Sequence, residues 1–362
     1  MSAAITRRAA LAAIGLGVCG ALAACEGDTA PSDRTAQPGP NQPDEPTGAP
    51  SRAADSEILL AALDRAGELA QRCREITGAT DWRATLQEQV QTALDEQVTV
   101  LANVLRAGNV EVPQPSTSAP APSPDDAAAS SGGPGDGATA SGSPGDTAAS
   151  TGDAADQTSG PSQAELAAAA LRDLGQSCLE DVSATSLDSL STVTAANLPM
   201  LISIAGQRGA TAHLFGQVPR WGDLTGPTDA AANSLLAAYR PAVYGFEVLA
   251  ARASGEERTA YEAVLDPLRT ATRQITQLAG KAAAPAPLGY GLPTGTGDED
   301  GRKRLAGELL AAIPPAIMGQ TRAFAGDGAS IAGSVRLLAD AVRLAQPWNP
   351  VTGFPGMRVP GA

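Results

Sequence analysis

The sequence predicts an all-α protein made of two helical bundles, with a disordered tether before them and a disordered insertion within the first. Three observations predict this fold class. Apolar residues recur at spacings of three and four along several segments, as they do on one face of a helix. Aromatic residues make up only 3% of the chain, so the core must consist mainly of Leu, Val, Ile and Ala, which suits close-packed helices. No segment shows the alternating pattern of a half-buried strand.

Residues 1–24 are predicted to be a cleaved export signal, because a paired arginine precedes an uncharged apolar run that ends at a cysteine. The run is shorter than the roughly 20 residues that a membrane-spanning helix needs. The motif L-A-A-C at 22 to 25 resembles a bacterial lipobox. The resemblance implies that the Cys25 thiol carries a diacylglyceryl group and that its freed amine accepts an acyl chain such as palmitate.

The export route stays open at this point. Arg7 and Arg8, followed by Ala-Ala-Leu, resemble a twin-arginine signal, but an ordinary charged signal start would look the same. Either route leads to a lipid-anchored protein on the extracytoplasmic face of the cell membrane. The net charge of −14 argues against nucleic acid as a partner, so the expected contacts are the membrane, through the anchor, and an envelope protein that the sequence does not identify.

The first half of the mature chain divides by composition. Few large apolar residues occur in 25–54, a predicted tether, or in 112–162, a Pro/Ser/Gly/Ala-rich insertion, so neither segment can bury enough surface to fold. Helical stripes occupy 55–111 and 163–216, two predicted hairpins that could close into one four-helix bundle across the insertion.

The second half is predicted to hold a linker at 217–227, a second helical bundle at 228–346 and a tail at 347–362. Ser254 and Glu257 have the spacing of a capping box, and Asp327 can cap the last helix. Prolines should bend three helices: Pro199 in a helix from about 190 to 215, Pro241 in the next, and the pair at 314 and 315 in a helix near 302–324.

Two cysteines remain once the signal is removed and Cys25 is lipidated. Cys73 and Cys178 both fall on inward helical stripes, and in an oxidising compartment the simplest expectation is a disulfide between them. Two free buried thiols, or a reactive pair, are the competing interpretations.

The stretch LLAAYRPAVYGFEVLAAR at 235–252, with GYGLP at 289–293 and GFPG at 353–356, resembles the C-terminal ferritin-like domain of unknown function found in actinobacterial lipoproteins. The resemblance implies a four-helix ferritin-like bundle with no known activity. A di-iron site of the ferritin type needs Glu-x-x-His on two helices. The chain has one histidine, His213, with Ala210 three residues before it, so no metal cofactor of that type is expected.

No residue is predicted to be catalytic, and the expected role is that of a binding or scaffold module. The alternative is a ferritin-like metal- or redox-linked protein with a carboxylate-only site. Each helix of the second bundle offers one acid for such a site: Glu247, Asp266, Glu308 and Asp340. The same acids would also occur on ordinary solvent-facing helix surfaces. A carrier of a small apolar ligand, held between kinked helices, is a third possibility.

Overall fold

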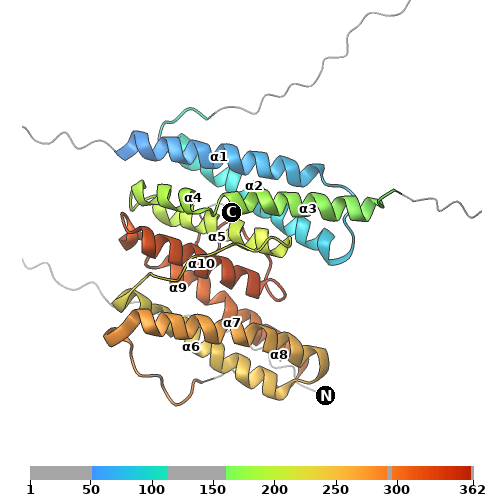
Figure 1. Ribbon diagram of the computed structural model, residues 1–362, viewed down its shortest axis with the longest axis vertical. Coiled ribbons are helices and arrows are strands. Elements are labelled where there is room, and N and C mark those ends of the chain that lie inside the picture. The colour runs from blue at the N-terminus through green and yellow to red at the C-terminus, as the bar shows by residue number, and fades with distance from the viewer. Residues whose placement is uncertain (1–50, 113–159, 292–295, 360–362) are drawn as a thin grey trace, which may run out of the picture. The chain divides into compact units, whose positions relative to one another are not determined.

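The computed structural model describes residues 51–112, 160–291 and 296–359, with side chains from Asp55 onward, all within one unit of the chain that spans 48–362. The described residues contain helices and no strand, which confirms the all-α prediction (Figure 1). None of these helices is both long and apolar enough to cross a membrane. Cys25 and the predicted signal, tether and insertion lie outside the described residues, except for the tether's last four and the insertion's two ends.

The N-terminal hairpin consists of α1 (Ser51–Glu75) and α2 (Asp81–Ala107), which pack against each other. α1 begins four residues earlier than its apolar stripe predicts. α2 ends at Ala107, and the backbone N–H of Gly108 donates to the carbonyls of Val104 and Leu105, each at 3.0 Å.

The second hairpin is less regular than the sequence predicts. It consists of α3 (Gln163–Glu180), α4 (Ala184–Ser189), the short 3-10 helix η1 (Leu190–Thr192) and α5 (Leu198–Leu214). The expected bend at Pro199 is wrong: this proline lies in the first turn of α5. Proline is tolerated there because the missing N–H would have no helical partner.

The C-terminal half consists of α6 (Asp229–Arg252), α7 (Gly255–Ala279), η2 (Gly280–Ala282), α8 (Glu299–Ala311), α9 (Ile313–Met318), η3 (Thr321–Phe324) and α10 (Gly328–Ala345). Pro241 lies inside α6. Pro314 and Pro315 do more than kink a helix, because α8 ends before them and α9 begins at their position. Asp327 caps α10 as expected, accepting from the Ser330 N–H at 3.1 Å.

The expected capping box at the start of α7 is wrong. The Ser254 side chain makes no cap hydrogen bond. Glu257 instead accepts from Arg302 of α8, from Nε at 2.9 Å and from Nη2 at 2.7 Å, and from the Tyr261 hydroxyl at 2.9 Å. A paired, charge-assisted contact to another helix has replaced a local cap.

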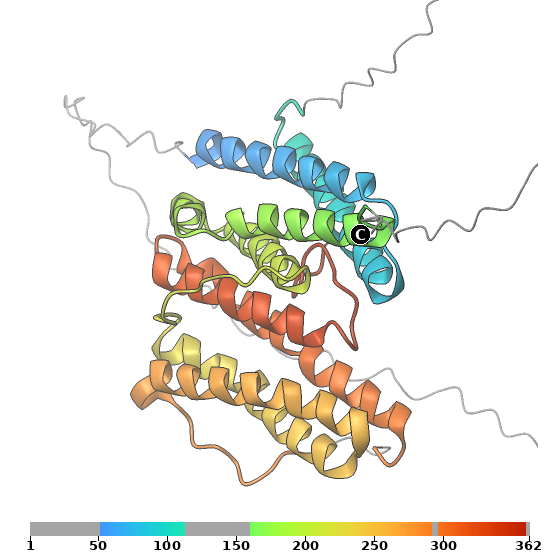
Figure 2. The same ribbon diagram turned by 45° about the vertical axis from the view of Figure 1, so that its right-hand side comes forward.

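The helices stack so that α5 and α10 face each other between the α1–α2 hairpin and the α6–α7 pair (Figures 1 and 2). Gly206 makes this approach possible, since a Cβ atom at this position would lie 2.9 Å from Leu338 Cβ. One cluster of buried apolar residues runs from Leu101 of α2 through Ile202 of α5 to Phe246 of α6. That the helices form two separate bundles stays a prediction.

The segment after α10, expected only as a tail, packs into the molecule. Gln97 of α2 donates to the Gly353 carbonyl at 3.0 Å, while the Gly353 N–H donates to Glu96 at 2.9 Å. Ser203 of α5 donates to the Pro355 carbonyl at 3.0 Å. We call residues 351–357 the C-terminal strap, because it joins α2 and α5 to the end of the chain.

Candidate functional site

The two cysteines predicted to pair lie in one buried cluster, on α1 and α3. Both are fully buried free thiols, and the structure contains no bond between them. Burial raises the pKa of Cys73 to about 11 and that of Cys178 to about 12. The Cys73 thiol donates weakly to the Gln87 carbonyl at 3.7 Å. Neither side chain therefore has the exposure or the lowered pKa of a reactive thiol.

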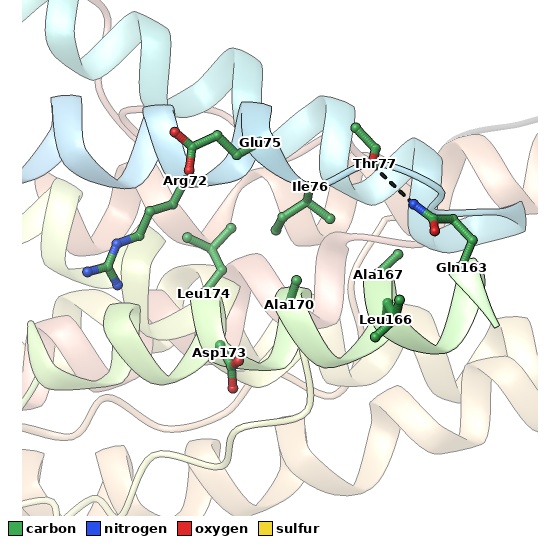
Figure 3. A pocket seen from close by; sticks show the side chains of 10 residues that line it. All are labelled: Arg72, Glu75, Ile76, Thr77, Gln163, Leu166, Ala167, Ala170, Asp173 and Leu174. Atoms are coloured by element: carbon green, nitrogen blue, oxygen red, sulfur yellow. Dashed lines mark hydrogen bonds between the residues drawn. The ribbon is translucent and has the colours of Figure 1, made fainter. Parts of the chain in front are cut away.

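A groove beside these cysteines is open to solvent. It lies between the end of α1 and the first half of α3 and has a volume of about 370 Å³, within the range of small ligand sites (Figure 3). The buried lining residues Ala167 and Leu174 form an apolar floor, and Leu166, which also lines the groove, is 50% exposed. A weak 3.4 Å hydrogen bond from Gln163 to the Thr77 hydroxyl crosses one end. We call this feature the α1–α3 groove.

The rim of the α1–α3 groove is charged. Arg72 donates to Glu68 at 2.9 Å and to the Ser177 hydroxyl at 2.7 Å, so its guanidinium is fixed against α3. Glu75 and Asp173 also line the groove. An apolar floor with a mixed-charge rim is typical of a surface that binds another chain.

A partly buried ion cluster lies farther along the same pair of helices, at residues that the sequence did not single out. Asp181 accepts from Arg65 of α1 at 2.9 Å and from Arg208 of α5 at 3.0 Å. The pKa of Arg208 is lowered, because the effect of burial exceeds the opposing effect of the nearby Asp181 carboxylate. Arg65 also donates to the Ser177 carbonyl at 2.7 Å. The cluster ties α1, the end of α3 and α5 together.

A signal for Arg208 was present in the sequence. It is the one charged residue in the stretch 198–212, whose other residues are apolar or uncharged, so a helix buried on all sides would give it an internal partner. The identity of that partner, 27 residues away, could not be inferred from helical spacing.

The four acids of the carboxylate-only alternative do not form a shared site. Glu247 pairs with Arg269 at 2.7 Å, and Asp340 lies 3.8 Å from Arg343. Within the described part of the chain, no group of three or more His, Cys, Asp or Glu side chains could hold a metal ion.

His213 lies in the last turn of α5 and is half-buried. Burial, and then the charge of Arg343, lowers its pKa. Its side chain makes no hydrogen bond to any residue that the structure describes.

Comparison with known proteins gave no match to a family model, to a curated protein or to a solved structure. The ferritin-like resemblance of the last third of the chain is therefore carried by its sequence motifs alone.

Proposed function

We propose that this protein is a lipoprotein, held at the extracytoplasmic face of the cell membrane by lipid on Cys25, and that it acts as a binding module for another envelope protein. The L-A-A-C motif at the end of an apolar run supports the anchor. We further propose a division into an N-terminal bundle and a ferritin-like C-terminal bundle that share the contact between α5 and α10.

The single observation that carries the binding role is the α1–α3 groove. Leu166, which lines the groove, is half exposed, while Arg72 at the rim is already engaged with Glu68 and Ser177. An exposed apolar residue in a concave, charge-rimmed surface gains free energy when a partner covers it. Arg72 of the rim is already held by Glu68 and by the Ser177 hydroxyl, so little ordering of this side chain is needed on binding.

A pair of exposed leucines tests the groove. A photoreactive residue at position 166 should give a discrete crosslinked product in intact cells. The same residue at position 288 should give none, because Leu288 is more exposed, at 109%, but does not line the α1–α3 groove. Equal crosslinking from both positions would contradict the proposal.

The anchor has its own test. Cys25→Ala should move the protein from the membrane fraction to the soluble fraction. A variant that stays membrane-bound as tightly as the wild type would show that the anchor lies elsewhere.

We also propose that Cys73 and Cys178 form a disulfide in the exported protein. They share one buried cluster, and closing a loop of about 100 residues would stabilise the fold by up to roughly 4 to 5 kcal/mol in the chain-entropy model. Alkylation of the denatured envelope protein should label neither thiol before reduction and both afterwards. Labelling before reduction would contradict the bond.

A further inference from the structure

A second hollow lies on the other side of α3 from the α1–α3 groove. It is formed by Trp82 and Arg83 at the start of α2, Leu171 and Arg172 of α3, and Leu214 and Phe215 at the end of α5. Its volume is about 200 Å³. A cavity of about 150 Å³ accommodates a benzene ring, so this hollow can take one aromatic or branched aliphatic side chain. We call it the Trp82 hollow.

The Trp82 ring is itself unusually exposed. Its side chain is 58% exposed, whereas the other two tryptophans of the chain are partly buried. The guanidinium carbon of Arg83 lies 4.7 Å from the centre of the ring, an arrangement that holds the cation beside the hollow. A large exposed aromatic next to an apolar cavity is typical of a binding hot spot.

Two positive charges border the hollow without carboxylate partners. Arg83 and Arg172 are exposed, and neither pairs with an acidic side chain among the residues that the structure describes. Arg65 and Arg302, in contrast, each hold a carboxylate within 2.9 Å. The nearest acids in sequence are Asp81, which accepts a hydrogen bond from Thr80, and Asp173, and neither lines the hollow.

We propose that the Trp82 hollow binds a peptide segment of a partner protein in which an aromatic or branched aliphatic side chain stands beside one or two carboxylates. The apolar side chain fills the hollow against Leu171 and Phe215, and the carboxylates pair with Arg83 and Arg172. This deepens the proposed binding function, because it assigns the partner's chemistry on the second side of α3.

Charge complementarity selects this occupant over a basic one. The whole chain carries a net charge of −14, so an acidic segment is repelled by most of the surface. The pair of arginines beside the hollow reverses that repulsion locally. Such a site favours an acidic segment that can also bury apolar surface, and it disfavours a purely charged one.

Trp82 provides the readout. The probe is an acetylated, amidated heptapeptide with a central Phe flanked by Asp and Glu, added to the purified mature protein. Burial of the Trp82 indole should shift its emission to shorter wavelength, saturably, and the shift should disappear in Trp82→Ala. A matched peptide with Lys in place of the acids, and one with Ala in place of Phe, should both bind more weakly.

The decisive variant removes both charges. Arg83→Gln combined with Arg172→Gln should weaken binding of the acidic peptide by roughly three- to tenfold, as expected for two solvent-exposed ion pairs. The matched control is Arg304→Gln combined with Arg322→Gln, two exposed arginines that also lack carboxylate partners among the described residues and should leave binding unchanged. Equal loss in both double variants, or equal binding of the acidic and basic peptides, would overturn the inference.

The crosslink from position 166 separates this inference from the proposed function. Loss of peptide binding with an unchanged crosslink in the Arg83 and Arg172 double variant confirms the inference. No peptide binding to the wild type, with the crosslink intact, overturns the inference alone. Peptide binding without any crosslink from position 166 supports the inference and overturns the proposal that the α1–α3 groove binds a partner.

Discussion

The close approach of α5 and α10 should depend on Gly206. In Gly206→Ala the new Cβ would lie 2.6 to 2.9 Å from Leu338, including 2.9 Å from its Cβ. A rotamer change cannot move that Cβ, because it is fixed to the α10 backbone, so the two helices must separate by roughly 0.5 to 1 Å. Overpacking of this kind costs about 1 to 3 kcal/mol. The better helix propensity of Ala returns about 1 kcal/mol at most.

Two other glycines provide matched controls. Gly245→Ala would meet only the end of the Leu309 side chain, at 2.3 Å from Cδ1, and that half-buried side chain can rotate away. Gly67→Ala on α1 would meet nothing within 4 Å and should stabilise by about 0.5 to 1 kcal/mol. Urea denaturation followed by circular dichroism should therefore rank Gly67→Ala first and Gly206→Ala last. If Gly206→Ala and Gly245→Ala proved equally stable, the packing described for α5 and α10 would be wrong.

Three further predictions concern contacts between elements. Asp181→Ala leaves the buried Arg208 without a carboxylate, whereas Arg65 keeps Glu68 and Glu180. The loss of the partner of Arg208 should lower the free energy of unfolding by roughly 3 to 5 kcal/mol, and a loss under about 1 kcal/mol in denaturant titrations would contradict the role of the partly buried ion cluster. The hydrogen bonds from Arg302 lower the pKa of Glu257 in the folded state. The ionised carboxylate therefore stabilises the fold at pH values above its unfolded-state pKa, and this stabilisation is lost as the pH falls through the folded-state pKa. The stability deficit of Glu257→Gln should thus be largest near about pH 7 and shrink toward about pH 3, whereas a deficit independent of pH would disprove the assignment. Gly353→Ala would place a Cβ 2.5 Å from the Ala93 carbonyl oxygen and should detach the C-terminal strap. Amide hydrogen exchange over 351–357 should become faster, and unchanged exchange would show that the strap is not held at Gly353.

Local features of the fold could be predicted because their causes lie within a few residues. The apolar stripe around Cys73 located α1, and the stripe around Cys178 located α3, so both cysteines were correctly expected to be buried. Asp327 was correctly assigned as a cap because an N-cap contact joins residues three positions apart. The same reasoning wrongly predicted a capping box at Ser254 and Glu257. The spacing was present, but the Glu257 carboxylate accepts two hydrogen bonds from Arg302 instead.

The remaining contacts could not be predicted, because helical periodicity tells which face of a helix is buried and not which helix covers it. The close approach of Gly206 to Leu338 and the hydrogen bond from Gln97 to the Gly353 carbonyl both join residues far apart in the chain. The α1–α3 groove has the same origin, since it exists only where two helices from separate hairpins diverge. Leu166 looked like an ordinary helix residue, and its exposure became informative only once its surroundings were known.

The reach of the groove from the membrane gives the last prediction. The proposed tether precedes α1, whereas the groove lies at the far end of this helix, beside Arg72 and Ile76. The 25-residue helix therefore places about 37 Å between them. The tether itself spans on the order of 30 Å, because the span of a flexible chain grows only with the square root of its length. Deleting residues 30–45 would reduce that span to about 20 Å, a small change beside the length of the helix.

The crosslink from position 166 should therefore survive this deletion in cells, provided that circular dichroism shows the variant to be folded and fractionation shows it still at the membrane. Deleting residues 120–150 of the predicted insertion is the control, since it removes chain without changing the distance from Cys25 to α1. A crosslink lost only in the first deletion would show that the length of the tether, and not that of the helix, determines whether the groove lies far enough from the membrane to meet its partner.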